Sequence, residues 1–204
     1  MIRVFIVRHG ETEWNRERRF QGWEDSPLTT AGREQVLSLA ERLKEYKLEY
    51  LYSSPSGRTM ETARIIANMK DLDIIKEPGF KEINLGDLEG KRVEWVNENY
   101  PDILNDFWND PVNYEPLSGE SFYDLKNRVL DTLDNILNKH GGENVMIVSH
   151  AAASKMMLSF FEGRKLEDLW EPPELKAASL SIVDIEEGEA NIKFYGDTSH
   201  YRTG

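Results

Sequence analysis

Short apolar runs alternate along this chain with longer segments in which apolar residues recur at helical spacing. The apolar runs are rich in β-branched residues, which is typical of buried strands. They lie at residues 2–7, 49–53, 73–76, 144–149, 179–185 and 190–195. The last two flank Glu187-Gly188 and predict a hairpin.

Helical periodicity fills the intervals between the runs. Thr29 or Thr30 can cap a helix whose inward face carries Val36, Leu39, Ala40 and Leu43. Further helices are predicted over about 58–68, from Ser121 to the Gly141-Gly142 stop, and over about 152–161. Strands that alternate with helices predict an α/β fold, a three-layer α/β/α sandwich with a mostly parallel sheet covered on both faces.

Residues 79–120 depart from this alternation. They are rich in Trp, Asn, Asp, Pro and Gly, with helical fragments near 92–100 and 103–108. We interpret them as an excursion over the sheet edge inside a single domain that spans 1–204. Their aromatic residues could line a substrate lid or simply pack the small helices onto the body, and packing is the default. These residues are Trp95, Tyr100, Phe107 and Trp108.

Composition narrows the classes of function. The 204 residues contain no cysteine, which excludes disulfides, a thiol nucleophile and thiolate metal sites. The net charge of −12 opposes binding to nucleic acid or to an anionic membrane, and we expect neither as a partner. The first apolar run is too short for a signal or membrane segment, so we expect a soluble, cytoplasmic protein. Any phosphate site must be a local pocket of arginines and backbone amides.

Histidine and arginine follow the ends of three predicted strands. Arg8-His9 follows residues 2–7, His150 follows residues 144–149, and Arg58 lies just beyond Ser53-Ser54-Pro55. The carboxyl ends of parallel strands meet at one edge of a sheet, where α/β proteins bind ligands. Ala151 opens a helix whose N-terminal amides favour an anion there. Guanidinium groups bind phosphoryl oxygens, and a neutral imidazole can accept a phosphoryl group.

These residues belong to a longer set of motifs. The segment Arg8-His9-Gly10-Glu11-Thr12-Glu13-Trp14-Asn15 resembles the signature of the histidine phosphatase superfamily, which includes cofactor-dependent phosphoglycerate mutases. More matches follow in the expected order over most of the chain. They are Gln21-Gly22-Trp23, Asp25-Ser26-Pro27-Leu28-Thr29, Ser53-Ser54-Pro55, Arg58-Thr59, Thr62-Ala63, Glu82-Ile83, Gly86, Glu89-Gly90, Gly119-Glu120-Ser121 and Val148-Ser149-His150.

The resemblance implies a phosphoglycerate mutase-like fold and a role for each matching residue. His9 would be the nucleophile that becomes phosphorylated, and Glu82 the acid that protonates the leaving group and then activates water. The residues alone do not distinguish Glu82 from Glu77 or Glu89; the resemblance does. Neither a metal nor a cofactor is implied. Arg8, Arg58 and His150 would hold the phosphoryl oxygens, with Asn15, Gln21, Gly22 and Ala151 around them.

The expected function is a metal-independent phosphomonoesterase for a small phosphorylated metabolite, in the branch that resembles α-ribazole phosphatase and metal-independent phosphoserine phosphatase. The substrate could be α-ribazole phosphate, phosphoserine, phosphoglycerate or a sugar phosphate. A phosphoglycerate mutase is the alternative, but mutases carry extra sequence after the acid and a Gly-Leu-Asn-Lys run where this chain has Gly90-Lys91-Arg92-Val93. A third, less favoured hypothesis is a non-catalytic phosphate-binding protein.

Two further histidines receive structural interpretations. His140 precedes Gly141-Gly142, where a cation would suit a helix C-terminus. His200 lies in a tail that could fold over the pocket, although a frayed end is the default. A homodimer is compatible with the sequence, which carries no pattern that specifies an oligomeric state.

Overall fold

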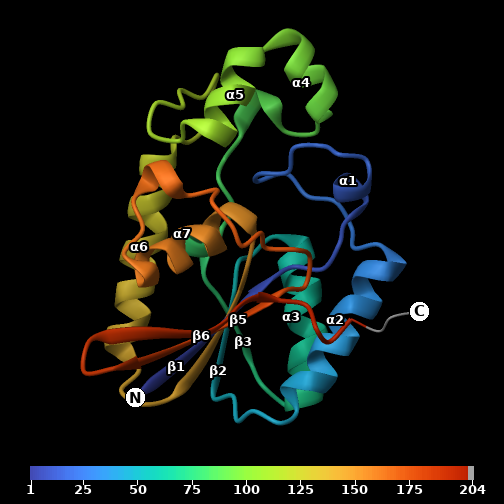
Figure 1. The fold of residues 1–204 in the computed structure, drawn as a ribbon. Helices are drawn as coiled ribbons and strands as arrows, with labels where there is room; N and C mark the ends of the chain where they lie inside the picture. The colour runs from blue at the N-terminus through green and yellow to red at the C-terminus, as the bar shows by residue number, and fades with distance from the viewer. Residues whose placement is uncertain (202–204) are drawn as a thin grey trace.

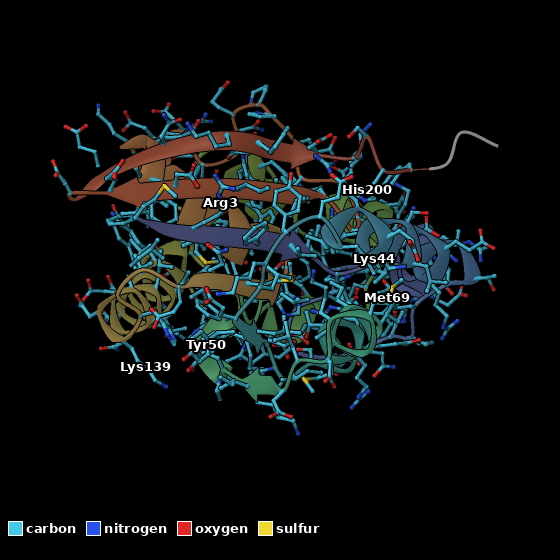
Figure 2. The ribbon with its side chains drawn as sticks, turned by 90° about the horizontal axis from the view of Figure 1, so that it is seen from below. Arg3, Lys44, Tyr50, Met69, Lys139 and His200 are labelled. Carbon is cyan, nitrogen blue, oxygen red and sulfur yellow. The ribbon has the colours of Figure 1, made fainter. Side chains whose placement is uncertain are left out.

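A six-stranded sheet runs through the centre of the part of the chain that this computed structural model describes, residues 1–201. Its strand order is β3-β2-β4-β1-β5-β6, and Figure 2 shows it from the β6 edge to the β3 edge. The first four strands in this order run parallel, while β5 is antiparallel to β1 and β6 antiparallel to β5. The strands are β1 (Ile2–Arg8), β2 (Tyr50–Ser53), β3 (Ile74–Lys76), β4 (Asn144–Ser149), β5 (Leu180–Glu186) and β6 (Glu189–Asp197).

The helices follow the predicted positions with small shifts in their ends. Thr29 caps α2 by accepting a hydrogen bond from the Gly32 amide, and Ser121 caps α6 through a capping box with Asp124. The prediction missed α1, a single turn. The helices are α1 (Glu13–Arg16), α2 (Thr30–Leu43), α3 (Gly57–Lys70), α4 (Val93–Asn99), α5 (Pro101–Asn109), α6 (Phe122–Lys139) and α7 (Ala151–Glu162). Short 3₁₀ turns occur at η1 (Pro78–Phe80), η2 (Gly86–Leu88) and η3 (Leu166–Asp168).

Alternation along β1 builds the three layers. Val4 and Ile6 pack in the core beneath α6 and α7, whereas Phe5 and Val7 pack against α2 and α3 on the opposite face. Each fully buried side chain of this kind stabilises the fold by about 1.5–3 kcal/mol. The predicted three-layer α/β/α sandwich is confirmed, and its helical layers flank the sheet in Figure 1.

The excursion at 79–120 carries α4 and α5, which lie beyond the carboxyl ends of the parallel strands (Figure 1). Phe107 of α5 is buried and joins the excursion to the body. Its ring lies 5.6 Å from Phe20, 5.1 Å from Phe122 and 5.6 Å from Trp170, measured between centroids. The ring of Phe107 therefore packs the excursion onto the body, as expected for an aromatic residue beneath a loop.

His140 is structural, but not as a cation. It is buried, its Nε2 atom lies 2.8 Å from the Tyr52 hydroxyl, and its ring lies 4.0 Å from that of Tyr50. Burial lowers the pKa of His140, which favours the neutral form. The predicted interaction of a charged His140 with the helix dipole is wrong for this reason.

The described part of the tail, up to Tyr201, passes beside α2. Arg42 of α2 pairs with Asp197 at 2.6 Å and donates to the Ser199 hydroxyl at 3.0 Å, and the Tyr201 hydroxyl donates to the Ala177 carbonyl. Figure 2 shows His200 on this side of the molecule. Residues 202–204 lie outside the described part of the chain. Among the described helices, none is long and apolar enough to cross a membrane.

Candidate active site

The carboxyl ends of β1 and β4, which are neighbours in the sheet, bring two histidines together. His9 follows β1 and His150 follows β4, and both side chains are buried. Their ring centroids are 5.4 Å apart with the planes at 65°. The His9 amide donates to the Ser149 carbonyl at 3.0 Å, which fixes the two strand ends side by side. The approach of these imidazoles is the one that the sequence predicts.

The hydrogen bond of His9 determines which ring nitrogen can react. Its Nδ1 atom lies 2.8 Å from the Gly10 carbonyl oxygen, and because that oxygen can only accept, Nδ1 carries the proton. Nε2 therefore retains its lone pair. Burial, followed by the charges of Arg58 and Arg8, holds the pKa of His9 well below its usual value. His9 is thus a neutral imidazole with one free nitrogen, as a nucleophile requires.

Glycine is needed at position 10 because the chain passes close to α2. A Cβ atom at Gly10 would lie 2.7 Å from the Gly32 carbonyl oxygen and 2.8 Å from Val36 Cγ2. Neither contact can be relieved without moving α2. The Arg-His-Gly sequence thus combines a charge, a neutral imidazole and a close backbone approach.

Arg58 is oriented by the loop at 22–25. The guanidinium is buried and donates to Asp25 Oδ1 at 2.8 Å and to the carbonyls of Gly22 and Glu24 at 2.7 and 2.9 Å. Gly22 consequently supports Arg58 through its carbonyl. Desolvation lowers the pKa of Arg58 and the Asp25 carboxylate opposes that shift, so the group stays charged.

Three buried nitrogens around His9 lack a hydrogen-bond partner within residues 1–201. They are Nε of Arg8, Nε of Arg58 and Nδ1 of His150. The Nε2 atom of His150 lies 2.8 Å from the Ser54 hydroxyl. When that hydroxyl donates its proton to Nε2, the neutral ring carries its own proton on Nδ1. This N–H group is then available to donate to a ligand. A buried donor without an acceptor costs about 1–3 kcal/mol. An anion with several oxygens, such as a phosphoryl group, would supply all three acceptors at once.

The carboxyl group of Glu82 occupies the N-terminus of α7. It accepts hydrogen bonds from the amides of Ala152 and Ala153, both at 3.1 Å, and from that of Ile83 at 3.0 Å. The sequence predicts that these helix amides face the phosphate; instead, two of them donate to the carboxyl group of Glu82. Ala151 remains in the wall of the cavity that also contains His9 and Glu82.

The backbone of Glu82 is held as firmly as its side chain. Its carbonyl accepts from Trp23 Nε1 at 2.9 Å and from Arg128 at 3.1 Å. Arg128 also pairs with Glu120 at 2.6 Å and donates to the Gly79 carbonyl at 2.9 Å. Sequence reasoning missed Arg128 and assigned no role to Glu120, because a single arginine on a polar helix face carries no signal of what it binds.

A cavity of about 400 Å³ is lined at one end by Arg8, His9 and Glu82. Arg58, His150 and Gly22 are not among its lining residues and lie behind this end. Asn15 and Gln21 line the cavity, as predicted; Asn15 Oδ1 accepts from the Thr12 amide and Gln21 Oε1 from the Thr12 hydroxyl, at 3.1 and 2.9 Å. The excursion supplies only part of the wall. The segment 170–175 supplies another part of the wall. The sequence did not predict this contribution.

A family comparison agrees with this geometry. The family model described as histidine phosphatase superfamily (branch 1) matches residues 4–198. The chain belongs to this superfamily. A probable phosphoglycerate mutase, GpmB, of Escherichia coli is 34% identical over 98% of this chain and 95% of its own length.

Solved structures of superfamily proteins share the fold. YhfR of Bacillus stearothermophilus matches with a TM-score of 0.94 and 38% identity, over 98% of this chain and 99% of that one. A phosphoserine phosphatase mutant of Entamoeba histolytica, in complex with phosphoserine, matches with a TM-score of 0.84 and 26% identity, over 98% and 99%. Solved structures named as a phosphoserine phosphatase and as a phosphoglycerate mutase share this architecture, so fold alone does not separate the two reactions.

The buried histidines of this superfamily member should make its stability depend on pH. Burial holds the pKa of His9 and of His150 well below the value near 6.5 that each regains on unfolding. The unfolded chain therefore binds more protons, so their contribution is fully present above about pH 6.5 and falls as the pH decreases below it. We expect the Tm to decrease from pH 7 to pH 5, because the free energy of unfolding falls by up to about 1.4 kcal/mol per pH unit and histidine. His150→Gln should reduce the dependence of Tm on pH. An unchanged dependence would contradict the attribution of this effect to buried neutral histidines.

Proposed function

We propose that this chain is a phosphomonoesterase that passes the phosphoryl group of a small metabolite through His9. The observation that carries the proposal is the set of three unpaired nitrogens on Arg8, Arg58 and His150 beside the free Nε2 of His9. Donors fixed in a water-poor pocket stabilise the charge on the phosphoryl oxygens in the transition state.

The proposed reaction has two balanced steps. The Nε2 lone pair of His9 forms a bond to phosphorus while the ester P–O bond breaks, and Glu82 gives its proton to the departing oxygen. Glu82, now a carboxylate, then takes a proton from water. The resulting hydroxide attacks phosphorus, the P–N bond breaks, and inorganic phosphate leaves with His9 and Glu82 restored.

Hydrolysis of p-nitrophenyl phosphate in the presence of EDTA tests this proposal. Arg8 and Arg58 supply positive charge without an ion, and the neutral His150 supplies a hydrogen-bond donor, so turnover should be the same with and without the chelator. A loss of activity in EDTA that a divalent cation restores would contradict metal independence. An inactive protein that still binds phosphate would favour the non-catalytic alternative.

Phosphoglycerate mutase activity is the second candidate, supported by the name of the E. coli relative. A mutase must keep phosphohistidine from water until a second acceptor binds. It predicts that 2,3-bisphosphoglycerate primes exchange between 2- and 3-phosphoglycerate faster than inorganic phosphate is released. We expect the reverse here, because the chain has Gly90-Lys91-Arg92-Val93 where mutases carry Gly-Leu-Asn-Lys.

A further inference from the structure

The cavity beyond the phosphate end has an apolar wall built from four separate parts of the chain. Phe20 comes from the N-terminal region, Ile83 and Leu85 from the segment after the acid, Phe107 and Trp108 from α5, and Trp170 and Leu175 from the segment before β5. In an ester bound at His9, this is where the leaving group would lie. Apolar walls with few polar groups select ligands by burial of apolar surface.

Two tryptophans form the outer part of this wall. Trp170 is held in place because its Nε1 atom donates to the Phe107 carbonyl at 2.6 Å. The ring of Trp108 lies 4.9 Å from that of Trp170, yet 44% of Trp108 is exposed. An exposed indole next to a fixed one offers a flat ligand a surface on which to stack.

Two cations, Arg19 and Lys155, lie near this apolar wall, and both already bind other groups of the protein. Arg19 pairs with Glu17 at 2.5 Å and donates to the Gly90 carbonyl at 2.7 Å. Lys155 Nζ donates to the carbonyls of Glu171 and Pro173 at 2.5 and 3.2 Å, and to the Tyr195 hydroxyl at 3.3 Å. Burial lowers the pKa of Lys155 to about 8, so the ammonium is still mostly charged at neutral pH, but its protons are taken by these three acceptors.

The remaining charge in this wall is negative. Glu174 is exposed and lines the cavity. Burial lowers the pKa of Arg8, and Glu82 and Glu174 are close enough to oppose that shift. A carboxylate on the leaving group would meet Glu174, while the cation beside it, Arg8, is occupied by the phosphoryl group. Like charges at short range repel each other even near the surface.

We infer that the preferred leaving group is a flat, apolar, aromatic alcohol without a carboxylate or second phosphate. The inference rests on the proposed function, because it assumes that the phosphoryl group binds at His9. It also bears on the choice between reactions, since the leaving groups of phosphoserine and phosphoglycerate both carry a carboxylate. The same wall that favours an aromatic ester therefore disfavours a mutase substrate.

Matched esters test the inference. We expect kcat/KM to decrease from 2-naphthyl to phenyl phosphate, and by about 10-fold or more from phenyl to 4-carboxyphenyl phosphate. Phosphoserine and 3-phosphoglycerate should be poorer still.

Trp108→Ala should lower kcat/KM for 2-naphthyl phosphate by about 10-fold. Trp95→Ala is the matched control, because Trp95 is exposed and does not line the cavity; it should have no effect. Glu174→Gln should raise the ratio of 4-carboxyphenyl to phenyl activity.

Binding of non-hydrolysable analogues separates failure of this inference from failure of the proposed function. Benzylphosphonate should bind about 10-fold more tightly than 4-carboxybenzylphosphonate in calorimetry, whether or not the protein turns over. Equal or inverted affinities would overturn the inference, as would 3-phosphoglycerate being hydrolysed faster than 2-naphthyl phosphate. Neither result would affect the role of His9. Selective binding without any hydrolysis would keep the inference about the site and reject the phosphatase.

Discussion

His9→Ala should lower kcat/KM for p-nitrophenyl phosphate by about 10³-fold or more, because no other group can form the covalent intermediate. The side chain of His9 is buried, neutral and fixed by the Gly10 carbonyl, so its removal takes away a nucleophile already oriented by the fold. Steady-state kinetics with purified variant and wild type measure the effect.

The control is His200→Ala, which removes a histidine that lies beside α2 and does not line the cavity. It should keep wild-type kinetics. The His9→Ala protein should also retain affinity for inorganic phosphate, because Arg8, Arg58 and His150 remain. Near-normal turnover in His9→Ala would refute the nucleophile assignment, whereas a loss of phosphate binding together with a large fall in Tm would indicate a folding defect.

Glu82→Gln should have the second largest effect, and its size should depend on the leaving group. General acid catalysis contributes about 10²–10⁴-fold, and it matters most when the departing oxygen is a strong base. We therefore expect a loss of that order in kcat/KM for an alkyl phosphate and a much smaller loss for p-nitrophenyl phosphate, whose leaving group needs no proton. Using kcat/KM confines the comparison to the steps up to cleavage of the ester bond.

Glu77→Gln is the matched control for this experiment. Glu77 precedes the same segment, but its side chain accepts from the Gly79 amide rather than from the amides of α7. It should affect neither substrate. An equal loss for both substrates in Glu82→Gln would mean that Glu82 acts by holding the N-terminus of α7, through Ala152 and Ala153, and not as the acid.

The sequence allowed prediction of the sheet and of the convergence of His9, Arg58 and His150, because both follow from local patterns. A buried β-branched run gives a strand, and parallel strands present their carboxyl ends at one edge. In the sheet, β2, β4 and β1 are neighbours, so the residues that follow their carboxyl ends lie together. A histidine directly after β1 and another after β4 therefore indicated the site, although the two strands are far apart in the sequence.

What could not be predicted depends on contacts that no local pattern encodes. The placement of Glu82 on the amides of α7, and of Arg128 on the carbonyl of Glu82, results from the packing of distant segments. The wall at 170–175 is another case. Trp170 is conspicuous in the sequence, but its role depends on a bond to the Phe107 carbonyl, 63 positions away. The pairing of His140 with Tyr52, 88 positions away, and the burial that favours its neutral form likewise come from packing between distant segments.

Direct detection of phosphohistidine is the decisive measurement. Wild-type protein mixed with a fast-reacting substrate, quenched in alkali within the first turnover and digested, should yield the peptide that contains His9 with one added phosphoryl group. The modification should be lost on acid treatment and be absent from His9→Ala. A phosphoryl group on another residue, or hydrolysis that proceeds with no labelled His9 at any time, would contradict the account.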